Sequence, residues 1–109
     1  MGIAYFDIDL NGVHDKRGFL DACARALCFP QTFGANWDAF ADYVQDLSWH
    51  PARGYVIRLR CAAGFAAAAP EDYAAAIEVL RYASDDWRRR GRPFIVLVDE
   101  AADLPVFSA

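Results

Sequence analysis

The run PFIVLVD at residues 93–99, taken with the stretch before it, decides the fold class. Its apolar residues are nearly continuous, which predicts a strand that is buried on both faces. The preceding stretch, EDYAAAIEVLRYASDDWRRRG at residues 71–91, has apolar side chains at helical spacing, acids at its start and arginines at its end. It predicts a long helix that Gly91 and Pro93 terminate. A long helix followed by a buried strand is typical of α/β folds.

Two further strands are expected upstream of this helix. YVIRLRC at residues 55–61 is apolar and β-branched in character, and IAYFDIDL at residues 3–10 alternates between apolar residues and acids, which predicts one wet face. Between these strands we expect two helices, one starting near Asp15 and ending before Pro30, the other covering residues 37–47. Strands separated by helices predict a parallel sheet with right-handed crossovers.

Composition narrows the class of partner and the cell compartment. The chain has 109 residues and 56% hydrophobic content, which fits one domain with an ample core. Its net charge of −4 argues against nucleic acid or an anionic membrane as the main partner, because both attract basic surfaces. We expect a cytoplasmic protein with reduced thiols. The sequence has no recognisable signal peptide or membrane-spanning run, and its three cysteines form no CxxC pair.

The stretch FGANWDAFADYVQD at residues 33–46 spaces three acids, Asp38, Asp42 and Asp46, four residues apart. On a helical wheel the three acids span about 80° of arc opposite the apolar side chains, so they should point away from the core. Their mutual repulsion and the low helix propensity of Asp disfavour the helix by about 1–2 kcal/mol in total. No Lys or Arg occurs at residues 26–52, so the sequence predicts a strongly negative local surface.

This row of acids has three possible roles. It can be a solvated surface that keeps the protein soluble, or a docking surface for the cations of a partner, where opposed charges speed encounter and fix register. A metal site is disfavoured because side chains at i, i+4 and i+8 diverge along ~12 Å of helix. We expect no metal and no cofactor, since His14 and His50 lack neighbouring ligands and no phosphate-binding or nucleophile motif is found.

The segment FPQTFGANWDAFADYV at residues 29–44 resembles the signature region of the barstar family, the intracellular inhibitors of barnase-type ribonucleases. The shared positions are Pro30, Phe33, Gly34, Asn36, Asp38, Ala39 and Asp42. The order of the expected strands and helices resembles that of the family over nearly the whole chain. The resemblance implies a single barstar-like α/β domain over residues 1–109, with a three-stranded parallel sheet packed by three to four α-helices.

The resemblance also implies where a partner would bind. In this family the second helix and the loop before it plug the ribonuclease active site, and their acids stand in for RNA phosphate. Asp42 is then expected to enter the cleft and meet catalytic Arg and His groups, with Asp38 as a second interface acid. From pattern and resemblance together, the predicted partner-binding residues are Thr32, Phe33, Gly34, Asn36, Trp37, Asp38, Ala41, Asp42, Asp46 and Trp49.

Two of these residues depart from the family pattern. Thr32 and Ala41 stand where the family has Tyr and Trp, and aromatic residues are frequent interface anchors. A family interface Glu late in the long helix also aligns poorly here, where Tyr82, Asp85 and Asp86 occur. The first hypothesis is a non-enzymatic inhibitor, monomeric when free, that blocks a basic barnase-like ribonuclease. The second is an interaction or regulatory module with a non-nuclease partner.

Overall fold

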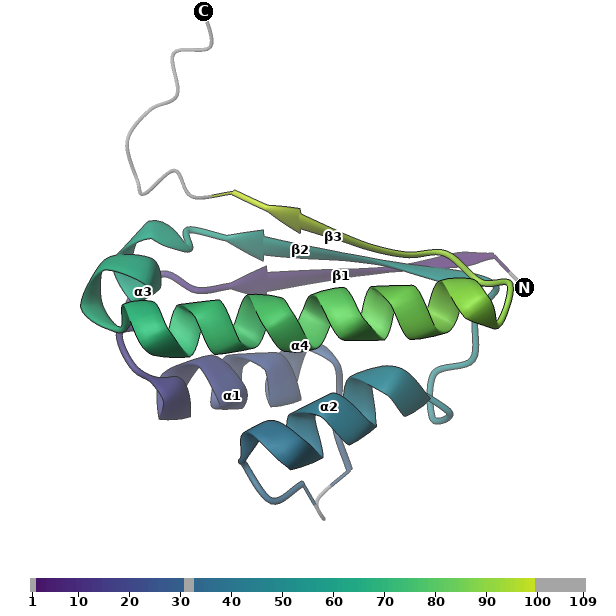
Figure 1. Ribbon diagram of the computed structural model, residues 1–109, viewed down its shortest axis with the longest axis horizontal. Helices are drawn as coiled ribbons and strands as arrows, with labels where there is room; N and C mark the ends of the chain where they lie inside the picture. The colour runs from purple at the N-terminus through teal and green to yellow at the C-terminus, as the bar shows by residue number, and fades with distance from the viewer. Residues whose placement is uncertain (1, 31–32, 100–109) are drawn as a thin grey trace, which may run out of the picture.

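The computed structural model describes residues 2–30 and 33–99. One sheet contains three parallel strands in the order β1-β2-β3, and four helices pack with it (Figure 1). The elements are β1 (Ile3–Asp9), α1 (Lys16–Ala26), α2 (Trp37–Asp46), β2 (Gly54–Arg60), α3 (Ala63–Ala68), α4 (Pro70–Arg89) and β3 (Phe94–Val98). The predicted α/β class, the parallel three-stranded sheet and the number of helices are confirmed.

The helices lie on one face of the sheet, and the other face is left uncovered by them (Figure 1). α1 packs against β1 and α4 against β3, while α2 packs on α4 on the side away from the sheet. The prediction that β3 is buried on both faces is therefore wrong. Ile95 and Leu97 of β3 are 49% and 48% exposed, because none of the described helices covers the outer face and β3 forms an edge of the described sheet.

Local signals set the helix boundaries. The Asp15 carboxylate accepts a hydrogen bond of 2.8 Å from the Gly18 N–H and caps the start of α1, which begins at Lys16, close to the predicted start near Asp15. The chain leaves α1 through Leu27 and turns at Cys28, whose φ is 55°. α4 begins with Pro70, where a missing N–H costs nothing. Among the described residues, none of the helices is long and apolar enough to cross a bilayer.

Aromatic rings pack the helices against one another and against the sheet. The fully buried Phe19 ring of α1 lies 5.5 Å from Phe40 of α2 and 5.1 Å from Phe65 of α3. On the other side of the core, Trp87 of α4 lies 5.0 Å from the Tyr55 ring of β2. Tyr55 is buried, which raises the pKa of its hydroxyl, and that hydroxyl donates to a backbone carbonyl. These contacts pack α1 against α2 and α3, and α4 against the sheet.

Candidate functional site

Asn36 starts α2 and orders the loop that precedes it. Its side-chain oxygen accepts a hydrogen bond of 2.7 Å from the Ala39 N–H, which makes it the N-cap of the helix. Its side-chain amide also donates to the Gly34 carbonyl at 3.5 Å. Asn36 thus sets where the helix begins, and with it the direction in which Asp38, in the first turn, points.

The three acids of α2 face solvent, as the wheel predicted. Asp38, Asp42 and Asp46 are exposed, while Phe40 and Val44 on the opposite side of the helix are fully buried. None of the three carboxylates lies within ion-pairing distance of a described Lys, Arg or His. We call these three residues the acidic face. Its charges are available to a partner because no described cation neutralises them directly.

The C-terminal end of α2 is held by α4. The buried Trp87 indole N–H donates 2.8 Å to the Val44 carbonyl, and the Arg90 guanidinium donates 2.6 Å to the Gln45 carbonyl. Arg90 also stacks on Trp87 at 3.8 Å and bonds Asp86 at 2.8 Å. The last carbonyls of a helix have no partner within the helix, so these two side chains satisfy groups that would otherwise need water. The acidic face therefore lies on a helix whose C-terminal end is held by hydrogen bonds from Trp87 and Arg90.

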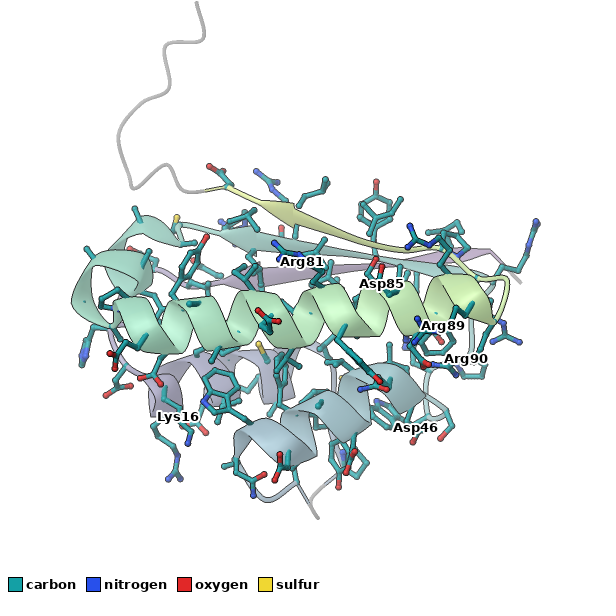
Figure 2. All side chains as sticks on the ribbon, viewed as in Figure 1. Lys16, Asp46, Arg81, Asp85, Arg89 and Arg90 are labelled. Atoms are coloured by element: carbon teal, nitrogen blue, oxygen red, sulfur yellow. The ribbon has the colours of Figure 1, made fainter. Side chains whose placement is uncertain are left out.

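Two cations from distant parts of the sequence lie near the ends of α2, where the sequence predicted a strongly negative surface. Lys16 of α1 lies 5.7 Å from the Trp37 ring at the start of α2, and Arg90 reaches the other end of the helix near Asp46 (Figure 2). Cations therefore stand at both ends of α2, and Asp42, at the middle of the acidic face, lies between them. This is the position that the resemblance implies would enter a ribonuclease cleft.

Four aromatic rings form a cluster beside the acidic face. The Phe29 ring lies 4.8 Å from Phe33, 5.2 Å from Tyr43 and 5.9 Å from Trp49, and all four side chains are half-buried. The Trp49 indole N–H donates 2.9 Å to the Leu27 carbonyl, so Trp49 also ties this loop to the end of α1. Sequence reasoning missed Phe29 and Tyr43. Only the position of Tyr43 on the wheel, beside the acids, pointed to it.

The other predicted site residues are more scattered. Trp37 is half-buried and packs toward the core, 6.0 Å from both Phe19 and Phe40. Ala41 is half-buried on α2, and Gly34 is exposed in the loop. Thr32 lies outside the described residues. The structure thus brings together the acids, Asn36, Gly34, Phe33 and Trp49, and turns Trp37 inward.

The late acids of α4 are already paired. Asp85 bonds Arg88 at 2.8 Å, and Asp86 bonds Arg90 at 2.8 Å and lies 3.6 Å from Arg89. Their negative charge is offset locally, unlike that of the acidic face. Among the described residues, no three His, Cys, Asp or Glu side chains gather to hold a metal ion.

Replacing Asn36 with alanine is expected to destabilise the fold by about 0.5–2 kcal/mol, because the cap of α2 and the bond to the loop are both lost. Equilibrium urea denaturation would measure the change. Asn36→Asp is the matched control, since its carboxylate can still accept the Ala39 N–H and should cost much less. Equal loss in both variants would contradict a capping role.

Comparisons with known proteins agree with this architecture. The family model described as Barstar (barnase inhibitor) matches residues 3–99. The match runs from the start of β1 to the residue after β3 and includes the loop and α2 with its acidic face. A search of curated proteins finds no match to the chain. Because the family model covers most of its length, the chain belongs to the barstar family.

Proposed function

We propose that this protein binds a basic, barnase-like ribonuclease in the cytoplasm and blocks its active site with the acidic face of α2 and the loop before it. The observation that carries the proposal is the row Asp38, Asp42, Asp46, exposed and unpaired with described cations on a helix that is fixed at both ends. Membership of the barstar family supports the same surface.

In the proposed mechanism the protein mimics the substrate and catalyses no reaction itself. A ribonuclease cleft that binds RNA presents Arg, Lys and His groups to phosphate, and carboxylates at a similar spacing meet those groups in the same place. The net charge of −4 and the exposed acids speed encounter with a positive cleft. Because caps and α4 already hold α2, little conformational freedom is lost on binding, so more of the charge attraction appears as affinity.

The test is a titration of the protein into a panel of barnase-like ribonucleases, with residual RNA cleavage as the readout. Stoichiometric inhibition is expected, together with an association rate that falls by roughly tenfold or more from low to physiological salt. Inhibition that needs a large molar excess, or that is insensitive to salt, would contradict an electrostatic plug. The protein acts without a cofactor, so no metal or nucleotide is added.

A second candidate function keeps the surface and changes the partner. This chain has Thr32 and Ala41 at two positions where the family has aromatic residues. Its own aromatic surface lies elsewhere, where the rings of Phe33 and Trp49 pack against Tyr43 of α2. A basic protein that is not a nuclease could match this altered surface. Affinity capture from the native cell would favour this candidate if it recovered a complex that has no ribonuclease activity. The same complex should not form with the Asp42→Ala variant.

A further inference from the structure

Exposed arginines gather where the C-terminal ends of α2 and α4 lie near the start of β3. They are Arg53, Arg88, Arg89, Arg90 and Arg92, and we call them the basic end. Figure 2 shows Arg89 and Arg90 near Asp46, the last residue of α2. Within the described part of the chain, only Asp85 and Asp86 form ion pairs with these arginines. The basic end therefore carries an excess of positive charge, opposite in sign to the acidic face.

Arg92 has hydrogen-bond donors left for an anion. It is exposed, and no carboxylate of the described residues lies within ion-pairing distance of it. Its guanidinium donates a long hydrogen bond of 3.4 Å to the Ala52 carbonyl. A guanidinium carries its N–H donors in a planar fork that matches the two oxygens of a carboxylate. Arg92 is therefore positioned to bind an acid that the described chain does not itself supply.

Arg92 lines a pocket that opens beside the acidic face. The pocket has a volume of about 450 Å³, and its walls include Asp46, Arg90 and Arg92. The Arg90 guanidinium stacks on the Trp87 ring at 3.8 Å, and the Arg92 guanidinium lies 6.0 Å from the same ring. Both cations are thus placed by one buried indole, and their positions are set before any ligand binds.

The charges around the pocket also act on Tyr55, which lines it. Burial raises the pKa of the Tyr55 hydroxyl, Arg92 and Arg90 oppose that rise, and Asp46 adds to it. The two guanidinium groups and the carboxylate therefore surround the same hydroxyl. The Ser48 hydroxyl donates 3.2 Å to the Asp46 carboxylate. Among the residues that line the pocket, two cations face one carboxylate, which favours an anionic ligand.

We propose that this pocket takes a carboxylate side chain of the ribonuclease whose cleft receives Asp42, an inference that rests on the proposed function. Asp46 follows Asp42 by four residues, about 6 Å along the helix, so the pocket adjoins the acidic face. An interface of ordinary size, ~800 Å² per partner, is wide enough to cover both. The partner is then a ribonuclease with a basic cleft and an acidic residue at the rim of that cleft.

The basic end gives the docking surface a direction. A partner surface that is positive throughout is attracted to the acidic face but repelled by Arg92 at the end of α2. A partner with an acid at that place gains a charge-assisted hydrogen bond with a guanidinium that is already in position. Repulsion of the first kind of partner and attraction of the second together discriminate among basic ribonucleases.

The test reverses the charge of Arg92 in the full-length chain. Arg92→Glu makes the net charge of −4 more negative by two, so attraction by overall charge alone would strengthen binding to a basic ribonuclease. We expect the opposite result. The dissociation constant for the inhibited ribonuclease, measured by titration of residual RNA cleavage at fixed salt, should rise roughly tenfold or more. Arg92→Gln, which only removes the charge, should give a smaller rise.

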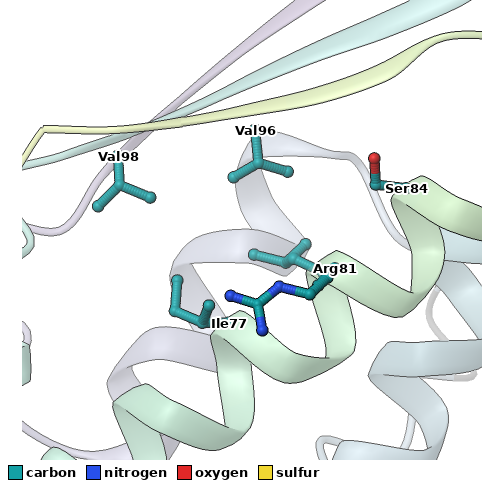
Figure 3. Close-up of a pocket in the computed structure, with 6 residues that line it drawn as sticks. Ile77, Arg81, Ser84, Val96 and Val98 are labelled. Carbon is teal, nitrogen blue, oxygen red and sulfur yellow. The ribbon is translucent and has the colours of Figure 1, made fainter.

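Arg81→Glu is the matched control because it makes the same charge change elsewhere on the protein. Arg81 is exposed and has no ion-pair partner within the described ranges. It lies in the groove between α4 and β3, beside Ile77 and Val96 (Figure 3). Its replacement should leave the dissociation constant unchanged or lower it slightly. The urea midpoints of all three variants should stay close to that of the original chain, which separates lost binding from lost folding.

Each other outcome overturns the proposal. An Arg92→Glu variant that inhibits as well as the original chain, or better, would refute the acid-binding pocket and leave the proposed function in place. An equal loss of affinity in Arg92→Glu and Arg81→Glu would assign the effect to overall charge. If the original chain inhibits no ribonuclease of the panel, the proposed function fails, and this inference fails with it.

Discussion

Replacing Asp42 with alanine is expected to weaken the complex with the target ribonuclease by about 2–5 kcal/mol, roughly 30-fold to 4,000-fold in affinity. Asp42 lies at the middle of the acidic face, and cations already stand near the ends of α2. In the complex its carboxylate would be enclosed by the partner's Arg and His groups. Its removal would leave those groups buried without a counter-charge, so most of the loss should appear as faster dissociation.

The same substitution should not harm the free protein. Asp42 is exposed on the helix, and its loss removes two like-charge i,i+4 contacts, with Asp38 and Asp46, worth roughly 0.2–0.5 kcal/mol each. Alanine is also the better helix former. The urea midpoint should therefore stay constant or rise slightly while binding falls. Glu78→Ala, which removes an exposed acid on α4, is the matched control. A similar loss of affinity in both variants would attribute binding to overall charge instead.

Replacing Trp87 with alanine is expected to destabilise the fold by about 3–5 kcal/mol. Trp87 is 2% exposed, and its ring packs 5.0 Å from Tyr55 and 6.4 Å from Phe94. The substitution opens a cavity between α4 and the sheet and leaves the Val44 carbonyl without its donor. Because a domain of this size holds ~5–15 kcal/mol in total, the variant should be close to unfolding at physiological temperature.

Thermal and urea denaturation would measure this loss, with a fall in Tm of more than about 12 °C. Trp87→Phe keeps a ring but removes the indole donor, and should cost about 1–3 kcal/mol through the unpaired Val44 carbonyl. Tyr82→Ala is the matched control on the same helix, since Tyr82 is 59% exposed and its loss should change stability by about 0.5 kcal/mol or less. A Trp87→Ala variant as stable as Tyr82→Ala would show that the contacts of Trp87 with α2 and the sheet are not needed for stability.

The parts of the fold that the sequence predicted correctly depend on signals between residues close together in the chain. Asp15 and Asn36 begin their helices because a capping side chain bonds an N–H three residues ahead, so the sequence alone contains the information. The error at β3 has the opposite origin. A run of apolar residues shows that a strand can be buried, but whether a second layer covers Ile95 and Leu97 depends on where the helices pack.

In the candidate site, too, some features follow from local sequence and others depend on how distant elements pack. The wheel placed Asp38, Asp42 and Asp46 on the solvent side of α2, because helical periodicity fixes direction once the apolar side is known. Trp87 and Arg90, which hold the end of that helix, lie more than forty residues further along the chain. No local pattern in α2 indicates them. Their hydrogen bonds to α2 depend on how α2 and α4 pack together in the fold.

The parallel sheet has a consequence for how the protein folds. Ile3 pairs with Gly54, and Tyr55 pairs with Phe94, so no two neighbouring strands are joined by a short turn. Each pairing must close a long loop before its hydrogen bonds and side-chain contacts compensate for the lost chain entropy. Helices α1 and α4 can form from local contacts, whereas the sheet must wait for distant segments to meet. Folding should therefore be slow for a chain of this length, with the sheet ordered in its last steps.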